Sequence, residues 1–429
     1  MMEQRRLQHM SLAVKPDLLG GTIHYRCILS ISCGGLLRLA INRGLRVVSA
    51  YEDDLPIAYT QGLQNVWAHG DVDVLLFSCR PKGLVLTLDL EGTILPYQHF
   101  WRYVRDTINP RCTLFRTDAF AHPIRVADSP DGLAVQHDEF SYDIEVTLSG
   151  DFTALCGGLV AAEQTENDRM IFTFAEPHPI WRVDLVMGAY APPFSSSGGT
   201  RFFLLEDSPS LAHGERIKKE ADACINLFVS LLGVMPGARP LTAIEIPDGM
   251  GGQAGEGYFL QQGCFFADPC AVDGIYHEIA HGWTTARAAG MAEGMRFFDE
   301  AIASYLQVFA LRRLHGGAAA AERLDGMRRA VGWALREAGS VEKTTLAHHG
   351  CDFQLAYNKG TFMLNALAEE MGEEVFLRAL RDFQHKHNAA SVDFVDFQQA
   401  TQACCDKDLN GFFDFWLYSG ESTLAILRA

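Results

Sequence analysis

His277-Glu278-Ile279-Ala280-His281 is an H-E-x-x-H sequence inside a segment with helical periodicity. Positions i and i+4 of a helix lie on the same face, so both imidazoles can reach one metal ion. Glu278 lies about 100° further round the helix, where its carboxylate can contact a water on that metal. The motif therefore predicts two zinc ligands, His277 and His281, and a general base, Glu278. The alternative is an amphipathic helix that matches the pattern by chance.

A third ligand is needed, because a catalytic zinc ion takes three protein ligands and keeps a fourth position open for water. Eighteen residues separate His281 from Glu300, which lies near the start of a helical pattern that begins at Phe297. A loop containing Gly290 and Gly294 lets a second helix bring the Glu300 carboxylate to the same ion. The alternative for Glu300 is a carboxylate stabilised by the helix dipole. We expect one Zn²⁺ per chain.

Helical periodicity dominates the chain on both sides of this motif, from about residue 207 onward. A short strand is expected at 241–246, before a glycine-rich stretch. The apolar spacing predicts helices at about 214–232, 272–287, 297–314, 319–338, 359–371, 373–386, 392–404 and 411–417. The second half of the chain is therefore expected to be mainly helical.

The first half shows an alternating, period-two pattern instead. Residues 22–31, 83–90 and 140–148 alternate or nearly so, and glycine turns follow the last two. The fold class is therefore α+β, with an N-terminal β-saddle or sandwich domain at 1–206 and a mainly helical domain at 207–429.

Composition limits the function classes. The chain has 429 residues, 48% of them hydrophobic, as expected of a packed protein with two or three domains. Its formal net charge of −17 disfavours nucleic acid and anionic membrane surfaces as partners. No apolar run is long enough to span a membrane. The 11 scattered cysteines predict reduced thiols and a cytoplasmic protein.

The motif and its surroundings resemble a known family. His277-Glu278-x-x-His281-x-Trp283, followed after eighteen residues by Glu300, resembles the gluzincin metallopeptidases of the aminopeptidase N family, which also contains the bifunctional leukotriene hydrolase. Tyr357-Asn358-Lys359-Gly360 is similar to the family's Tyr-x-Lys-Gly segment, where the tyrosine hydroxyl stabilises the transition state. The resemblance implies a β-saddle, a thermolysin-like catalytic domain, a peptide substrate, and a short form without the large helical C-terminal domain.

The resemblance also implies a site for the substrate's free α-amine, and here the chain departs from the family. The family's Gly-x-Met-Glu-Asn stretch corresponds to residues 251–257, where Ala254 aligns with the glutamate and Glu256 is a shifted substitute. Leu114 replaces a second amine-contacting residue and cannot accept a hydrogen bond. Gly251, Gly252 and Glu256 are the predicted substrate-binding residues, and the alternative for Glu256 is an exposed loop carboxylate.

The predicted function is zinc-dependent peptide hydrolysis of the aminopeptidase type. An endopeptidase-like or peptide-tailoring hydrolase that needs no free amine is the first alternative. A noncatalytic binding protein on a peptidase fold is the second. The oligomeric state stays open.

Overall fold

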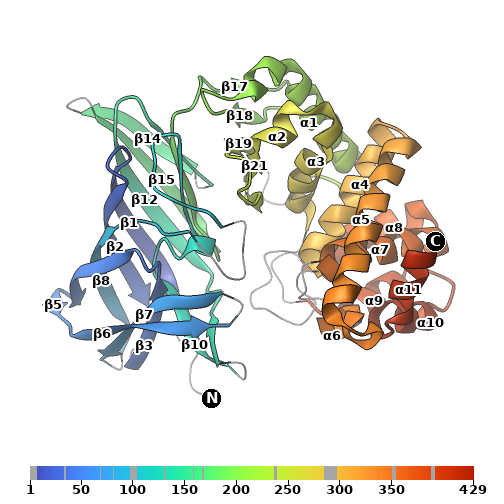
Figure 1. Ribbon diagram of the computed structural model, residues 1–429, viewed down its shortest axis with the longest axis horizontal. Coiled ribbons are helices and arrows are strands. Elements are labelled where there is room, and N and C mark those ends of the chain that lie inside the picture. Colours follow the sequence, from blue (N-terminus) through green and yellow to red (C-terminus); the bar gives the residue numbers. More distant parts are fainter. Residues whose placement is uncertain are drawn as a thin grey trace. The chain divides into compact units, whose positions relative to one another are not determined.

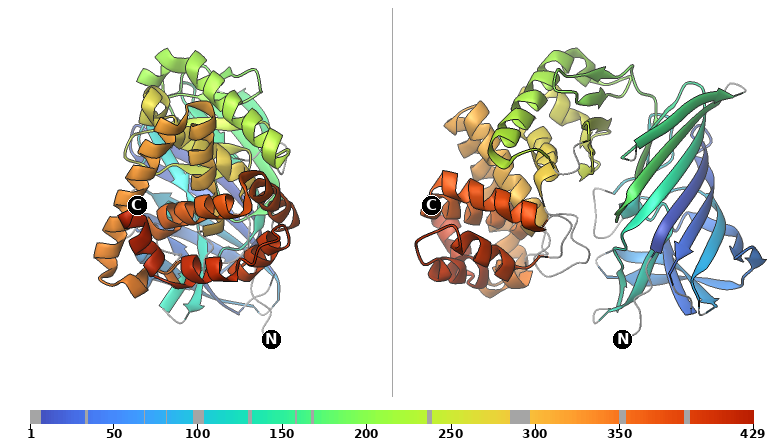
Figure 2. Two further views of the ribbon diagram at one scale, coloured as in Figure 1. Left: turned by 90° about the vertical axis from the view of Figure 1, so that its right-hand side faces the viewer. Right: turned by 180° about the vertical axis from the view of Figure 1, so that it is seen from behind.

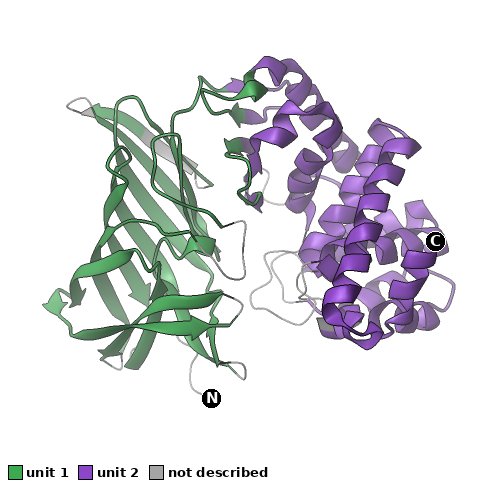
Figure 3. Cartoon of the chain, in the orientation of Figure 1, with its two compact units in different colours: residues 1–193, 202–211, 244–252 green, residues 194–201, 212–243, 253–429 purple. Residues whose placement is uncertain are grey.

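The computed structural model divides the chain into two compact units (Figure 3). Unit 1 contains residues 1–193, 202–211 and 244–252, and unit 2 contains residues 194–201, 212–243 and 253–429. The structure describes residues 7–32, 35–67, 69–80, 82–96, 104–129, 132–157, 159–166, 169–235, 239–284, 297–349, 354–387 and 392–429. Between residues 194 and 252 the chain alternates between the two units. The domains expected at 1–206 and 207–429 stay a prediction.

An eight-stranded sheet forms much of unit 1 (Figure 1). Side chains alternate between buried and exposed along its central strands, as the period-two pattern requires. The strands expected at 22–31, 83–90 and 140–148 are present. In spatial order the strands are β14 (Leu159–Glu166), β15 (Arg169–Ile180), β12 (Phe140–Ser149), β1 (Leu7–Asp17), β2 (Thr22–Ile31), β8 (Leu84–Gly92), β4 (Leu45–Glu52) and β5 (Leu55–Pro56).

Two further strand groups complete unit 1. One is a closed ring of β10 (Ile124–Ser129), β11 (Gly132–Val135), β6 (Tyr59–Val66), β7 (Gly70–Cys79) and β3 (Gly35–Ile41). The other is a small sheet of β13 (Thr153–Cys156), β16 (Asp184–Gly188) and β9 (Cys112–Arg116). The large sheet and the small sheet share one apolar core.

Unit 1 also buries charged side chains. Arg116 and Asp106 are both fully buried and form a two-point ion pair with distances of 2.7 and 2.8 Å. Arg182 bonds Asp184 at 2.6 Å and Asp118 at 2.9 Å. Each of these carboxylates therefore has a guanidinium partner.

Unit 2 is mainly helical, as Figures 1 and 2 show. The chain crosses from one unit to the other near β17 (Phe194–Ser195), β18 (Arg201–Phe203) and β19 (Thr242–Ile246). A hairpin, β20 (Gln253–Gly255) and β21 (Tyr258–Gln262), precedes most of the helices. The α-helices are α1 (Gly214–Leu232), α2 (Gly263–Ala267), α3 (Asp273–Ala280), α4 (Ile302–Leu314), α5 (Gly317–Ala338), α6 (Leu346–His349), α7 (Gly360–Met371), α8 (Glu373–His387), α9 (Phe394–Gln402), α10 (Asn410–Phe413) and α11 (Glu421–Arg428).

Most expected helices of unit 2 agree with the structure, and the α+β class is confirmed. Within the described residues, three helices are preceded or followed by π-helical segments: η5 (Phe297–Ala301), η7 (Leu355–Lys359) and η8 (Asp414–Tyr418). The sequence pattern did not predict these segments, because an apolar stripe does not distinguish a π-turn from an α-turn.

The helix expected at 272–287 is wrong at its C-terminal end. Helix α3 ends at Ala280, a 3₁₀ turn follows at His281–Trp283, and Thr284 is extended. The Thr284 amide donates to the His281 carbonyl oxygen at 3.2 Å, and the Thr284 hydroxyl lies 3.1 Å from the same oxygen, which closes the helix end. The expected loop glycines Gly290 and Gly294 lie outside the described residues.

Two further expectations concern the cysteines and membrane-spanning segments. None of the nine cysteines in the described part of the chain forms a disulfide bond. No helix in the described ranges is long and apolar enough to cross a membrane.

Candidate metal site

Helix α3 presents the two histidines of the motif. All eight residues of α3 are buried, and the helix packs against α1, α4 and β21. A helix buried on every side is held by its neighbours rather than by one apolar stripe. His281 begins the 3₁₀ turn but keeps helical dihedral angles, φ −57° and ψ −21°, so the i, i+4 geometry holds. The two imidazole rings lie 4.8 Å apart, centroid to centroid, and are perpendicular at 89°.

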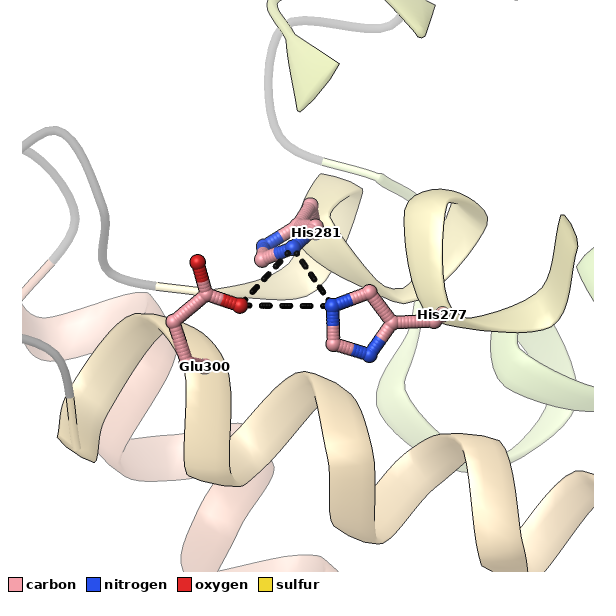
Figure 4. A group of neighbouring side chains, drawn as sticks. All are labelled: His277, His281 and Glu300. Carbon is pink, nitrogen blue, oxygen red and sulfur yellow. Dashed lines mark hydrogen bonds and ion pairs between the residues drawn. The ribbon is translucent and has the colours of Figure 1, made fainter. Parts of the chain in front are cut away.

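The π-helical segment η5 presents Glu300. Phe297, Phe298 and Ala301 of this segment are buried and anchor it in the aromatic core of unit 2. Glu300 points away from that core toward the two histidines (Figure 4). π-helical turns are rare and occur frequently at functional sites.

The three side chains direct one donor atom each to a common point (Figure 4). His277 Nε2 lies 3.2 Å from His281 Nε2 and 3.2 Å from Glu300 Oε2, and His281 Nε2 lies 3.5 Å from Glu300 Oε2. Zinc–ligand bonds of about 2.0–2.1 Å at tetrahedral angles place two donors about 3.3 Å apart. The donor types and the three separations therefore fit a zinc ion. No other group of three His, Cys, Asp or Glu side chains among the described residues has such an arrangement.

Burial and mutual charge set the ionisation of the three groups. Burial lowers the pKa of the His277 imidazole, which favours the neutral form that binds metals. Burial would also lower the pKa of His281, but the Asp299 and Glu300 carboxylates raise it well above its ordinary value. Burial would raise the pKa of Glu300, but the neighbouring imidazoles lower it. The Glu300 carboxylate is therefore held ionised, as a metal ligand must be.

Glu278 lies on the same helix and is buried, with 8% of its surface exposed. The amide nitrogen of Gln261, in β21, donates to Glu278 Oε1 at 3.4 Å and to the Gly274 carbonyl at 3.0 Å. The Gln262 amide donates to Gln261 Oε1 at 2.8 Å, which fixes which end of the Gln261 amide faces Glu278. Gln261 was not predicted, since a strand glutamine carries no motif.

Tyr357 lies beside the histidines. Its ring stacks on the His277 imidazole, with centroids 5.5 Å apart and planes 16° apart. The buried Lys359 ammonium donates to the Thr344 carbonyl at 2.7 Å and the Ser419 carbonyl at 3.3 Å, which anchors the segment η7 that carries Tyr357. Burial lowers the pKa of Lys359 to about 7.

A glycine allows the segment of Tyr357 to approach that of Glu300. A Cβ atom at Gly360 would lie 2.5 Å from the Ala301 Cβ, closer than side chains tolerate. The Lys-Gly pair after Tyr357 therefore has a structural reason: the lysine anchors η7, and the glycine permits contact with η5.

The predicted substrate-binding residues are divided between the two units. Gly251 and Gly252 belong to unit 1, where the Gly251 carbonyl accepts a hydrogen bond from Arg116 at 3.2 Å. Glu256 belongs to unit 2 and occupies the two-residue turn between β20 and β21 with Gly257, whose φ is 75°. Leu114 is buried in β9, with 1% of its surface exposed.

Asp299 and Thr284 also contact the site and were not predicted. Asp299 Oδ1 lies 2.6 Å from His281 Nδ1, and the Thr284 hydroxyl lies 3.0 Å from the same oxygen. The available signal was the acidic residue directly before Glu300. Sequence spacing alone does not show that it reaches back to His281.

The family described as the Peptidase family M1 domain matches residues 270–416, a range that contains all three donor residues. For residues 270–416 this match bears out the family predicted from the sequence. No curated protein sequence matches the chain. The match rests on the M1 domain itself, which runs from before α3 to within η8.

Solved structures of M1 metallopeptidases share the fold. A mutant of the M1 zinc metallopeptidase of Deinococcus radiodurans, bound to the substrate Tyr-Ser-Ala, is 16% identical, with a TM-score of 0.66 over 97% of this chain and 94% of that chain. Native yeast LTA4 hydrolase is 13% identical, with a TM-score of 0.70 over 97% of this chain and 68% of that chain. At these identities the likeness shows the fold, from the β-sheet unit through the M1 domain.

Proposed function

We propose that this protein is a zinc-dependent peptide hydrolase of the aminopeptidase type. One observation carries the proposal: His277 Nε2, His281 Nε2 and Glu300 Oε2 lie at mutual distances of 3.2–3.5 Å, with Glu278 on the same helix. The match of residues 270–416 to the M1 domain supports it.

In the proposed reaction His277, His281 and Glu300 would hold zinc. When bound, zinc polarises the scissile carbonyl and acidifies the attacking water. Glu278 takes the proton from that water and later delivers it to the leaving amine. Gln261 holds the Glu278 carboxylate through a hydrogen bond to Oε1. The Tyr357 hydroxyl donates a hydrogen bond to the oxyanion.

We propose a peptide with a free N-terminus as substrate. The similar enzyme from Deinococcus radiodurans was solved with the substrate Tyr-Ser-Ala, and a short peptide of that kind is a suitable first test. Glu256 is the residue that we assign to the substrate's ammonium group, through a charged hydrogen bond.

The alternative of an endopeptidase-like or tailoring hydrolase rests on a specific observation. Ala254, in β20, has no hydrogen-bonding side chain, and the Leu114 side chain is buried in β9. Two positions that contact the amine in the family are therefore without a polar group. A noncatalytic binding protein is the remaining alternative, and the presence of Glu278 and Tyr357 beside the three donors disfavours it.

The first experiment tests chemistry. Wild-type protein is expected to hold zinc close to one ion per chain and to hydrolyse Tyr-Ser-Ala. Glu278→Gln is expected to keep zinc but lose turnover, since an amide cannot take the proton. Full turnover by Glu278→Gln would contradict the proposal, and zinc-loaded wild type that cleaves no peptide would favour the binding protein.

The second experiment tests recognition of the free amine. Hydrolysis of Tyr-Ser-Ala is compared with that of its N-acetylated form, which carries no ammonium group. Glu256→Ala should raise KM for the free peptide and leave the acetylated peptide unaffected, whereas Glu322→Ala, an exposed carboxylate of α5, should change neither. Equal wild-type rates on both peptides would favour the endopeptidase or tailoring alternative.

A further inference from the structure

We propose that Asp299 is a positioning residue that sets the zinc affinity of the site through His281. This inference rests on the zinc site of the proposed function, but it concerns a residue that contributes no donor atom to the group of three. Asp299 directly precedes Glu300 in η5, so one π-helical segment supplies both a donor and a support for another donor.

The two nitrogens of His281 have different neighbours. Nε2 faces His277 Nε2 at 3.2 Å and Glu300 Oε2 at 3.5 Å, and Nδ1 faces Asp299 Oδ1 at 2.6 Å. A carboxylate accepts hydrogen bonds, so the proton of a neutral His281 ring belongs on Nδ1. The Nε2 lone pair is then directed at the point that the other two donors share.

Asp299 is itself held in place. The Thr284 hydroxyl is 3.0 Å from Asp299 Oδ1 and 3.1 Å from the His281 carbonyl oxygen. Thr284 is the extended residue that ends the 3₁₀ turn after α3. Its hydroxyl therefore connects the end of that helix to the start of η5. The His281 and Asp299 side chains are 12% and 29% exposed, which limits competition from water.

The physical effect follows from the hydrogen bond. A carboxylate on the far nitrogen selects the correct tautomer, prevents ring rotation and increases the donor strength of the metal-facing nitrogen. Loss of such an outer contact typically reduces metal affinity about 10- to 100-fold. The expected consequence of losing Asp299 is weaker zinc binding with an unchanged number of ligands.

The test measures zinc affinity rather than turnover. The full chain, stripped of metal, is titrated with zinc in competition with a chelator of known affinity. Asp299→Ala should raise the dissociation constant about 10- to 100-fold. Asp299→Asn should lie between Asp299→Ala and wild type, because its amide oxygen still accepts from Nδ1. Asp325→Ala, an exposed acid of α5, is the matched control and should bind as wild type.

A double-mutant cycle distinguishes an effect of Thr284 through Asp299 from general destabilisation of the fold. Thr284→Val should weaken zinc binding in the wild-type background but not in Asp299→Ala, because the hydroxyl acts through the carboxylate. Thermal unfolding of the metal-free proteins checks that each variant folds, and Asp299→Asn, nearly identical in shape, keeps the test valid if Asp299→Ala does not.

Each outcome has one reading. Zinc affinity within twofold of wild type in both Asp299 variants would overturn this inference and leave the proposed function standing. Wild-type protein that binds no zinc would overturn both. Equal weakening by Thr284→Val in both backgrounds would show that Thr284 acts independently of Asp299, contrary to the inference.

Discussion

Each unit of this protein contains a cluster of ionisable side chains, and the two clusters differ in how their polar groups are satisfied. In unit 1, Arg116 and Asp106 are both fully buried and bond through two nitrogen–oxygen contacts. In unit 2, His277, His281 and Glu300 turn three lone-pair donors toward one point. The first cluster neutralises itself, whereas the second is suited to a cation that the chain does not supply.

The difference shows how a structural cluster is distinguished from a functional one. Buried charges are tolerated when each is paired and hydrogen-bonded, and the guanidinium–carboxylate pair meets this condition without any ligand. Two imidazoles and a carboxylate with facing donors meet it best around a metal ion. Four predictions test this contrast, in order of decreasing expected effect.

Removal of a donor should abolish metal binding. His281→Ala leaves two donors, which are too few to hold zinc against dialysis. Elemental analysis should show the metal content falling from near stoichiometric to near zero. His385→Ala, an exposed histidine of α8, should keep its zinc. Full zinc occupancy in His281→Ala would refute the ligand assignment.

Removal of one partner in unit 1 should destabilise the fold without touching the metal. Arg116→Met leaves the Asp106 carboxylate buried without its cation, which should cost about 3–5 kcal/mol in denaturant unfolding. Arg46→Met breaks an exposed pair with Glu91 and should cost less than about 1 kcal/mol. The double variant Arg116→Met, Asp106→Leu should recover much of the loss, and no recovery would contradict the explanation.

Loss of the Tyr357 hydroxyl should affect turnover alone. Tyr357→Phe keeps the ring that stacks on His277 but removes a donor to the oxyanion. We expect kcat to fall about 10²- to 10³-fold, with zinc content unchanged. Tyr418→Phe, which alters an exposed tyrosine of η8, is the control. Wild-type kcat in Tyr357→Phe would reduce the tyrosine to a packing role.

The smallest effect is expected at Gln261. Gln261→Met removes the amide that donates to Glu278 and should lower kcat about tenfold, the value of a hydrogen bond to a charged group. KM and zinc content should not change, because the substitution leaves the three donors in place. Gln384→Met, at a buried glutamine of α8, should leave kcat unchanged. An equal fall in both variants would attribute the effect to general destabilisation.

Part of the fold and of the candidate site was predictable because it is local. The i, i+4 spacing of His277 and His281 follows from the helical repeat, and the alternation in residues 140–148 follows from the geometry of a strand. The helix expected at 297–314 lost only its first turn to the π-helical segment η5. The expected end at 287 was wrong because the turn at Thr284 is closed by local contacts with the His281 carbonyl oxygen, which an apolar pattern does not encode.

The sequence by itself determined the donor types, their order along the chain, the α+β class and the family. Only the tertiary structure decided that Asp299 supports His281, that Gln261 holds Glu278, and that Arg116 is paired inside unit 1. The physical reason is the range of the forces involved. Helical and strand periods are set by neighbours in the chain, whereas these contacts join residues separated by 10 to 18 positions and exist only after packing has brought separate elements together.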